Sequence, residues 1–224
     1  PSKRGSLAQV ATIVQDVRTG TDHPVLLLDS GDTIQGTPFE QFINVRWGEP
    51  SPTIAAMNRI GYDAMAVGNH EFNFGLEVLR RAEEQAGCPC LSANRVRAGT
   101  PEPAFQPFAI VEAGAIKVGV LGLITPNIPG WETPENYAGL EFQPMDEAAR
   151  IWVPRLRQDE GCDLVVVIAH TGFEGDPETG ELNGTEHENF IVRLTEVPGI
   201  DVLLTGHTHD DIPPHLVNGV YVSQ

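Results

Sequence analysis

The chain has 224 residues, of which 41% are hydrophobic, with 23 glycines and 18 prolines, and this suits a globular protein with one substantial core and structured loops. Its formal net charge of −17 argues against a nucleic-acid polymer as partner, because contacts to a phosphate backbone need clustered Lys and Arg. A small phosphate compound stays compatible with this charge, since bound divalent cations invert the local field. No stretch approaches the roughly 20 apolar residues of a membrane span, and no secretory signal is visible before the first helical pattern.

The N-terminal part of the chain alternates predicted helices and strands. Apolar residues at helical spacing indicate a helix over 6–18. A second helix over 52–60 is bounded by Ser51 as N-cap and by Gly61 as a stop signal, and a third covers 76–86. The apolar runs between these helices predict strands over 24–32, 62–71 and 90–94.

The C-terminal part returns to this alternation after a hairpin. The pattern over 104–125 predicts a β-hairpin, and a Pro-rich loop follows at 126–139. A long helix is expected over 146–160, with Asp146 as its cap and a kink at Pro154. The remaining elements expected are a strand over 163–170, a helix over 187–195, a strand over 201–209 and a last strand from 219 onward. The whole pattern predicts one α/β domain without repeats or linkers.

Four predicted strands run into short motifs of potential metal ligands. The motifs are GDTIQG at 31–36, GNHEFNFG at 68–75, AHTGF at 169–173 and GHTH at 206–209. Ligands of open α/β folds bind at the carboxyl ends of the strands, so these motifs are expected to meet there. The sequence therefore predicts one metal-dependent site that contains Asp32, Asn69, His70, His170, His207 and His209.

The residue types in these motifs suit divalent cations. Asp32 lies between flexible glycine turns, where its two oxygens can bridge two cations. Asn69 offers a neutral amide oxygen, a ligand for a hard or borderline cation. His207 and His209 are two residues apart, so an extended backbone would place both rings on one face, with Thr208 turned away.

The second motif also offers a proton donor. His70 follows Asn69 directly, so its ring can face a substrate while Asn69 faces a metal, and it can steady phosphoryl oxygens or protonate a leaving alkoxide. Asn73 can hydrogen-bond the other ring nitrogen and hold its orientation, and Glu71 is expected to support the loop. The chain contains no GxSxG elbow, P-loop or GxGxxG motif. The residues therefore favour attack on a phosphoester by a water that cations acidify.

These motifs, in this order, resemble those of the calcineurin-like metallophosphoesterases. GDTIQG, GNHEFNFG and LSANR at 91–95 are similar to the 5′-nucleotidase-like branch, and the match runs over essentially the whole chain. Within that branch, 5′-nucleotidases and UDP-sugar hydrolases usually carry Asp where this chain has Asn73. Asn73 and the stretch VGVLGLITPNIPGW at 118–131 resemble the 2′,3′-cyclic-nucleotide 2′-phosphodiesterase/3′-nucleotidase proteins instead.

The resemblance implies a four-layer αββα sandwich around two divalent metal ions, which the sequence leaves open among Mn, Zn, Fe, Co and Mg. It implies that Asp32 bridges the two metals and that His209 joins one of them. The other metal site is expected to be completed by Asn69, His170 and His207. His70 is the expected catalytic histidine, oriented by Asn73.

The chain departs from the family pattern at both ends. The family begins with a strand ending in Asp-x-His, which supplies two metal ligands, and no such motif precedes Asp32. The family's C-terminal nucleotide-binding domain does not follow residue 224 either. Residues 1–224 are therefore expected to be a metallophosphoesterase catalytic domain truncated at both ends. The resemblance also implies an extracytoplasmic enzyme, in the periplasm, in the cell wall or secreted.

The predicted function is metal-dependent hydrolysis of nucleotide phosphoesters by a water that a dinuclear metal centre activates. Small-molecule substrates, 2′,3′-cyclic nucleotides and 3′-nucleotides, are favoured. Two alternatives stay open. One is a 5′-nucleotidase or UDP-sugar hydrolase. The other is a metal-binding fragment without catalysis, because the loss of two ligands would weaken the first metal and with it the activated water.

Overall fold

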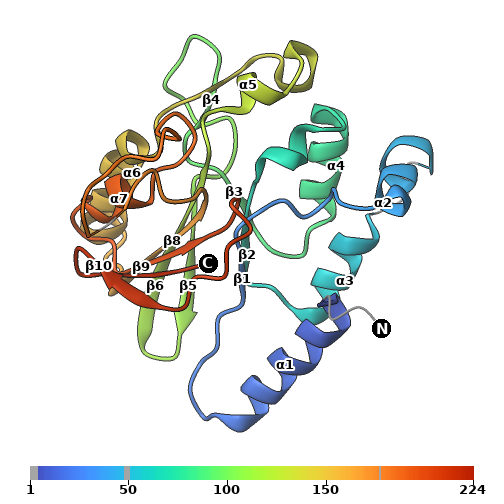
Figure 1. The fold of residues 1–224 in the computed structure, drawn as a ribbon. Coiled ribbons are helices and arrows are strands. Elements are labelled where there is room, and N and C mark those ends of the chain that lie inside the picture. Colours follow the sequence, from blue (N-terminus) through green and yellow to red (C-terminus); the bar gives the residue numbers. More distant parts are fainter. Residues whose placement is uncertain (1–4, 48–50, 177) are drawn as a thin grey trace.

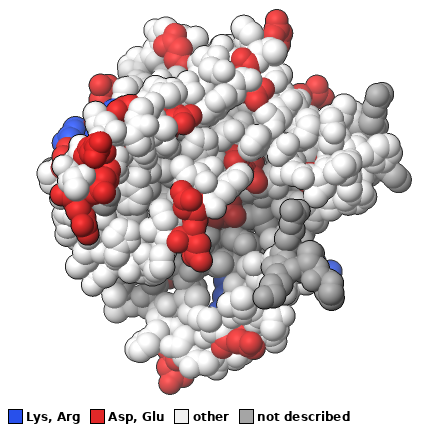
Figure 2. Space-filling view, in the orientation of Figure 1, with Lys and Arg blue, Asp and Glu red and all other residues white. Residues whose placement is uncertain are grey.

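The described residues, 5–47, 51–176 and 178–224, fold into four layers in the computed structural model (Figure 1). Two helices cover a small sheet, the small sheet packs on a large one, and further helices cover the large sheet. This confirms the four-layer αββα arrangement that the family resemblance implied. Acidic side chains are spread over the face shown in Figure 2 and basic ones there are few, in line with the net charge of −17.

The small sheet is parallel and carries two helices on its outer face. Its strands, in spatial order, are β1 (Leu28–Asp29), β2 (Ala64–Ala66) and β3 (Cys90–Leu91). The covering helices are α3 (Pro52–Ile60) and α4 (Leu76–Gln85), and α1 (Leu7–Gly20) lies against α3. The Ser51 hydroxyl caps α3 by accepting from the Ile54 amide, and Gly61 ends it with φ +81°, as the sequence predicted.

The large sheet is mixed, with its parallel strands in the centre. Its order is β10-β11-β9-β8-β6-β5, and the edge strands β5 and β10 pair antiparallel with their neighbours. The strands are β5 (Phe108–Ala113), β6 (Ile116–Ile124), β8 (Leu164–His170), β9 (Val202–Thr205), β10 (His215–Val217) and β11 (Val220–Ser223). The predicted hairpin over 104–125 is β5 and β6. Helices α6 (Met145–Pro154) and α7 (Ile191–Thr195) cover the outer face.

The core follows from the period-two alternation of the central strands. On β6, Val118 and Val120 face the small sheet, whereas Leu121 and Leu123 face α6. On β8 the residues alternate in the same way. The sheets approach each other closely at Gly122, where an added Cβ would lie 2.3 Å from the Leu91 Cβ. Both faces of β6 and β8 are thus buried, which explains their continuous apolar runs.

Shorter elements connect these layers. Before β2 come α2 (Pro38–Phe42) and the π-helical turn η1 (Ile43–Trp47), and after β2 comes the 3-10 turn η2 (Asn69–Phe72). A two-stranded ladder joins β4 (Arg95–Arg97) and β7 (Leu140–Phe142). The other short elements are α5 (Ile128–Trp131), the 3-10 turn η3 (Pro134–Tyr137) and the π-helical turn η4 (Arg155–Asp159).

Several predicted boundaries were wrong. Asp146 does not cap α6, since the helix begins at Met145 after Pro144, and Asp146 lies in the first turn, where its charge suits the helix dipole. At Pro154, where a kink was expected, α6 ends and the chain continues as the π-helical turn η4. Helix α7 begins at Ile191 rather than 187. The Pro-rich loop contains α5 and η3. Among the described residues, no helix has the length and apolar character that crossing a membrane requires.

Candidate active site

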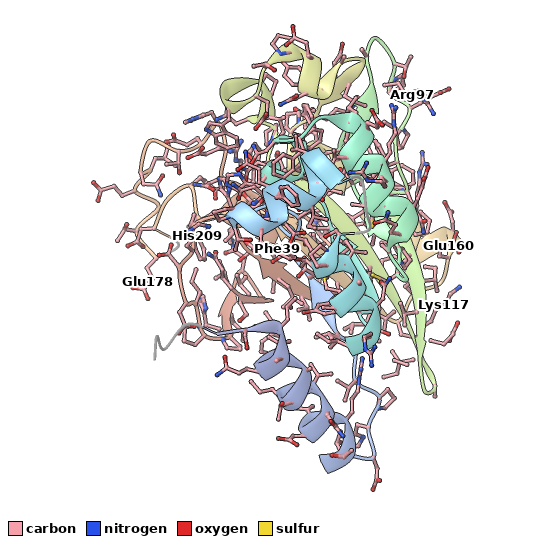
Figure 3. The ribbon with its side chains drawn as sticks, turned by 90° about the vertical axis from the view of Figure 1, so that its right-hand side faces the viewer. Phe39, Arg97, Lys117, Glu160, Glu178 and His209 are labelled. Carbon is pink, nitrogen blue, oxygen red and sulfur yellow. The ribbon has the colours of Figure 1, made fainter. Side chains whose placement is uncertain are left out.

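The carboxyl ends of the two sheets meet at one edge, and the four motifs lie there. Ser30, the residue after β1, joins the sheets: its hydroxyl donates to the Thr205 carbonyl at 2.9 Å, and its carbonyl accepts from Nδ1 of His170 at 2.8 Å. Figure 3 shows His209, beyond the end of β9, on the opposite side of the molecule from Lys117 and Glu160, which lie near the amino ends of β6 and β8. The four motifs therefore lie together at one edge of the sheets, as expected.

Two glycines let the first two motif loops touch. A Cβ on Gly31 would lie 2.5 Å from the backbone nitrogen of Gly68, and a Cβ on Gly68 would lie 2.3 Å from Oδ1 of Asp32. No larger residue fits at either position. Asp32 itself has φ +64°, a left-handed conformation that is uncommon outside glycine and is found mostly for Asn and Asp.

The Glu71 carboxylate joins these two loops through hydrogen bonds. Its side chain is 1% exposed, and its carboxylate accepts backbone hydrogen bonds from Gly68 at 2.6 Å, Asp32 at 2.9 Å, Ile34 at 3.1 Å and Thr33. A carboxylate has only acceptor sites, so it can satisfy all these donors at once. Glu71 therefore supports the loop, as expected from the sequence.

Glu71→Gln is expected to lower the free energy of unfolding by roughly 3 kcal/mol, because the amide that replaces one oxygen would face buried N–H donors. Urea unfolding of the metal-free chain, followed by circular dichroism, measures this. Glu77→Gln, at an exposed position in the first turn of α4, is the control with the same chemical change. A loss below about 1 kcal/mol, comparable to that of a surface substitution, would show that the loop is not held by Glu71.

Four predicted ligands come together at this edge. Nε2 of His170 lies 3.0 Å from Oδ2 of Asp32 and 3.0 Å from Oδ1 of Asn69. The same Asn69 oxygen lies 3.1 Å from Nδ1 of His207. Donors that share a cation at bonds of about 2.0–2.2 Å lie about 3 Å apart where the bonds meet at right angles, so these spacings fit one cation. Within the described ranges, no three His, Cys, Asp or Glu side chains form a cation cage by themselves, and the Asn69 amide is what links the donors.

The electrostatics of the site also suit a cation. His170 donates from Nδ1 to the Ser30 carbonyl, so Nε2 is the atom that faces the oxygens of Asp32 and Asn69. Burial favours the neutral ring, but the hydrogen bond and charge of Asp32 outweigh it and raise the pKa of His170. Burial and the neighbouring His170 lower the pKa of His207 to about 4, so this ring is neutral near pH 7. A cation would take the place of the proton on His170, and the mixed oxygen and imidazole set suits a borderline metal.

The extended backbone predicted for residues 207–209 was wrong. Strand β9 ends at Thr205, and His207 and His209 have φ +82° and +61°. The Thr208 amide donates to the Gly206 carbonyl at 3.1 Å, which closes a tight turn around His207. This turn separates the two rings: His207 joins the donors, whereas His209 is exposed and makes no side-chain hydrogen bond to a described residue.

His70 lies beside the donors, and its ring takes part in a separate set of contacts. Its backbone N–H donates to Oδ1 of Asp32 at 2.8 Å, and its Nδ1 lies 2.7 Å from Oδ1 of Asn73. The amide nitrogen of Asn73 donates to Glu132. Sequence reasoning missed Glu132, which follows α5 in the loop predicted over 126–139, because no local pattern relates it to Asn73 59 residues earlier.

The LSANR motif has a structural role. Asn94 is fully buried, donates to the carbonyls of Ile124 at 2.7 Å and Gln143 at 2.9 Å, and accepts from the Ile124 amide at 2.9 Å. It thus ties the segment after β3 to the end of β6 and to the segment before α6. Asn94 thus stabilises the strand ends, and in the described part of the chain it makes no hydrogen bond to the four donors.

The fold and the site define a metallophosphoesterase class. The family model described as Calcineurin-like phosphoesterase matches residues 3–211, so the chain belongs to the calcineurin-like phosphoesterase family. Members of this family are generally dependent on divalent metals. This agrees with the family resemblance found in the sequence motifs.

Two curated relatives match nearly the whole chain, and one of them is a nucleotide phosphoesterase by name. The 2′,3′-cyclic-nucleotide 2′-phosphodiesterase/3′-nucleotidase of Yersinia enterocolitica is 32% identical over 225 residues, which cover 95% of this chain and 33% of that protein. Protein UshA of Escherichia coli strain K12 is 32% identical over 209 residues, which cover 92% of this chain and 37% of that protein. The chain thus spans about a third of the length of these relatives.

Solved structures share the fold. The calcineurin-like phosphoesterase YfkN of Bacillus subtilis superposes with a TM-score of 0.84 at 27% identity, covering 99% of this chain and 73% of that one. A 5′-nucleotidase precursor of Thermus thermophilus gives a TM-score of 0.77 at 27% identity, covering 98% of this chain and 43% of that one.

Proposed function

We propose that the chain is a catalytic domain that hydrolyses phosphoesters of nucleotides with two divalent cations, and that 2′,3′-cyclic nucleotides and 3′-nucleotides are the favoured substrates. The observation that carries the proposal is the convergence of four donor side chains next to His70: Asp32, Asn69, His170 and His207. Membership of the phosphoesterase family and the name of the Yersinia enterocolitica relative support the reaction class.

The donor residues are assigned to two cations. The four converging side chains would hold one cation. Asp32 and His209 would contribute to the other, an assignment that rests on the family resemblance. When bound, divalent cations polarise a phosphoryl oxygen and acidify a water for in-line attack. Mn, Zn, Fe, Co and Mg all stay open, because a donor set of this mixed kind accepts each of them.

His70 is the proposed general acid. Its Nδ1 faces Asn73, and Nε2 has no hydrogen-bond partner among the described residues, so Nε2 is the atom left to meet a substrate. From there it would steady the phosphoryl oxygens or give a proton to the leaving alkoxide. Asn73 holds the ring in this orientation. His70 needs no contact with the cations to do so.

The substrate preference rests on a short part of the sequence. Asn73, where 5′-nucleotidases usually carry Asp, and the stretch over 118–131 favour the cyclic-nucleotide and 3′-nucleotide class. A second candidate is a 5′-nucleotidase or UDP-sugar hydrolase, which the similarity to the Thermus thermophilus 5′-nucleotidase precursor favours. A third is a metal-binding module without turnover, which the assay described below separates from the other two.

The place of the chain in a larger protein is also proposed. Because the chain spans about a third of the length of its relatives, residues 1–224 would act as the catalytic domain beside a C-terminal nucleotide-binding domain.

Following the family resemblance, the protein would work outside the cytoplasm. Fractionation of the source cells, with detection of the protein by antibody, tests the location, and its recovery with the cytoplasmic markers would refute it.

An assay with Mn²⁺ on 2′,3′-cyclic AMP, 3′-AMP and 5′-AMP, combined with elemental analysis of bound metal, tests the proposed function. We expect two bound cations and turnover of the first two substrates. Two cations with turnover of 5′-AMP alone would replace the favoured substrate by the second candidate. One cation without turnover of any ester would leave only the metal-binding module.

A further inference from the structure

Glu132 is the last member of a row of side chains that begins at His70. Nδ1 of His70 lies 2.7 Å from Oδ1 of Asn73, and the amide nitrogen of Asn73 donates to Oε1 of Glu132. The other carboxylate oxygen of Glu132 accepts from the amide of Asn136 at 2.7 Å. Both oxygens are therefore engaged, and each by a different amide.

The donor and acceptor atoms of these side chains decide which group donates at each hydrogen bond in the row. An Asn side chain has an oxygen on one side and a nitrogen on the other, and it can present either of them to a neighbour. A carboxylate has only acceptor oxygens, so it takes the nitrogen end of Asn73. The oxygen end then faces His70, and because that oxygen can only accept, Nδ1 of His70 must carry a proton.

The segment that carries Glu132 is held in place from both sides. The Glu132 backbone N–H donates to the Ile128 carbonyl at 3.0 Å, which closes the last turn of α5. The neighbouring Trp131 packs its ring on that of His207, with centroids 5.4 Å apart. Asn136 lies in η3, directly after this segment. Glu132 is thus fixed relative both to Asn73 and to the donor residues.

We propose that Glu132 is a positioning residue that selects the orientation of the Asn73 amide, so that the Asn73 oxygen holds the Nδ1–H of His70 and the ring presents Nε2 to a phosphoester. The role of Nε2 rests on the proposed function, whereas the orientation of the amide does not. Without the carboxylate, Asn73 could turn its nitrogen to His70, and the ring would then have to accept at Nδ1. A ring that accepts at Nδ1 carries no proton there, so it could not take the doubly protonated form, which gives a proton from Nε2 and keeps one on Nδ1.

A purely structural role for Glu132, as a brace for α5 and η3, makes a different prediction. If Glu132 only supported these two elements, Glu132→Ala would be harmful whatever residue occupies position 73. An orienting role depends on Asn73, because a carboxylate at that position presents an acceptor to His70 in either orientation. Asn73→Asp should therefore rescue Glu132→Ala. In the presence of Glu132, Asn73→Asp should be harmful by itself, since the two carboxylates would face each other.

The first test is nuclear magnetic resonance of the metal-free chain labelled with ¹⁵N-histidine, with spectra recorded across a range of pH. The His70 ring is assigned by the loss of its signals in His70→Gln. We expect a single tautomer with the proton on Nδ1 in the unaltered chain, and a second tautomer with the proton on Nε2 in Glu132→Ala. Glu135→Ala changes an exposed glutamate of η3. It is the control and should leave the signals unchanged.

The second test is steady-state kinetics with Mn²⁺ on the preferred ester. Glu132→Ala should lower kcat by about 10- to 100-fold, a part of what a general acid contributes, with KM within about threefold. Asn73→Asp alone should also be slow, and the double variant should recover most of kcat. Glu135→Ala should match the unaltered chain.

The two tests separate the failures of the two proposals. If the unaltered chain hydrolyses no ester, the proposed function fails, and the resonance experiment still decides the orienting role. An unchanged tautomer in Glu132→Ala would overturn that role. So would a loss of kcat in Glu132→Ala that Asn73→Asp does not rescue, which would show that Glu132 only braces the loop.

Discussion

Asp32→Asn is expected to reduce metal-dependent hydrolysis by at least about 1,000-fold, which corresponds to the several kcal/mol that a bound cation contributes to stabilising charge. Asp32 is the carboxylate that faces His170 in the described site, so the substitution removes its negative charge. The shape is kept: an Asn oxygen can still accept from the His70 amide, and Asn tolerates the left-handed φ of +64°. The loss should therefore come from metal binding and not from misfolding.

Elemental analysis and steady-state kinetics on the same samples measure this effect. Asp22→Asn changes the net charge by the same amount at an exposed position and should leave both the metal content and kcat unaltered. The thermal unfolding of the two metal-free variants should match that of the unaltered chain. Full metal content together with kcat within about tenfold of the unaltered chain would contradict the assignment of Asp32 as a ligand.

His70→Ala is expected to lower kcat by about 10²- to 10⁴-fold, the range of a general acid, while the bound metal stays nearly constant. The ring of His70 contacts Asn73 and not the four donors, and its backbone N–H to Asp32 is kept by Ala. Catalysis and metal binding should thus separate at this residue.

The same two measurements decide the role of His70. His23→Ala, which alters an exposed histidine after α1, is the control and should resemble the unaltered chain. If the metal content of His70→Ala falls together with kcat, His70 is a ligand and its assignment as the acid is wrong. If kcat stays unchanged, another group protonates the leaving alkoxide.

Most of the non-glycine residues with a strained backbone conformation lie at the proposed metal centre. Among the described residues, the non-glycine positions with positive φ are Asp32, His207, His209 and Asn218, and the first three belong to the GDTIQG and GHTH motifs. Such conformations cost about 1–3 kcal/mol each and persist where the surroundings enforce them. Here Glu71 and the glycine contacts hold the Asp32 loop in its conformation. A bound cation would be expected to stabilise these turns further.

The sequence allowed much of the fold to be predicted. Helices α1, α3 and α4 lie where the apolar period and the caps placed them, β5 and β6 form the predicted hairpin, and β8 lies where its apolar run placed it. Four of the predicted ligands meet at the carboxyl ends of the strands: Asp32, Asn69, His170 and His207. These predictions succeeded because periodicity and capping are local, and because parallel strands bring their carboxyl ends to one edge.

Predictions that depended on the local path of the backbone were less successful. Residues 207–209 were expected to be extended, but the chain turns sharply at His207, so His209 does not share a face with it. Asp146 was expected to cap a helix that instead starts after Pro144. At residues 207–209 several backbone conformations suit the same sequence, and the turn that is observed brings His207 to the distant Asn69.

The sequence by itself determined the family, because the motifs each lie within one short segment, and through that resemblance it implied the four layers and the residues proposed as metal donors. Only the tertiary structure decided how the segments face one another. It brought the Glu71 carboxylate under the Asp32 loop, separated His209 from His207, and placed Glu132 against Asn73. Hydrogen bonds act over about 3 Å, and the packing of the loops decides which groups far apart in the sequence come within that distance.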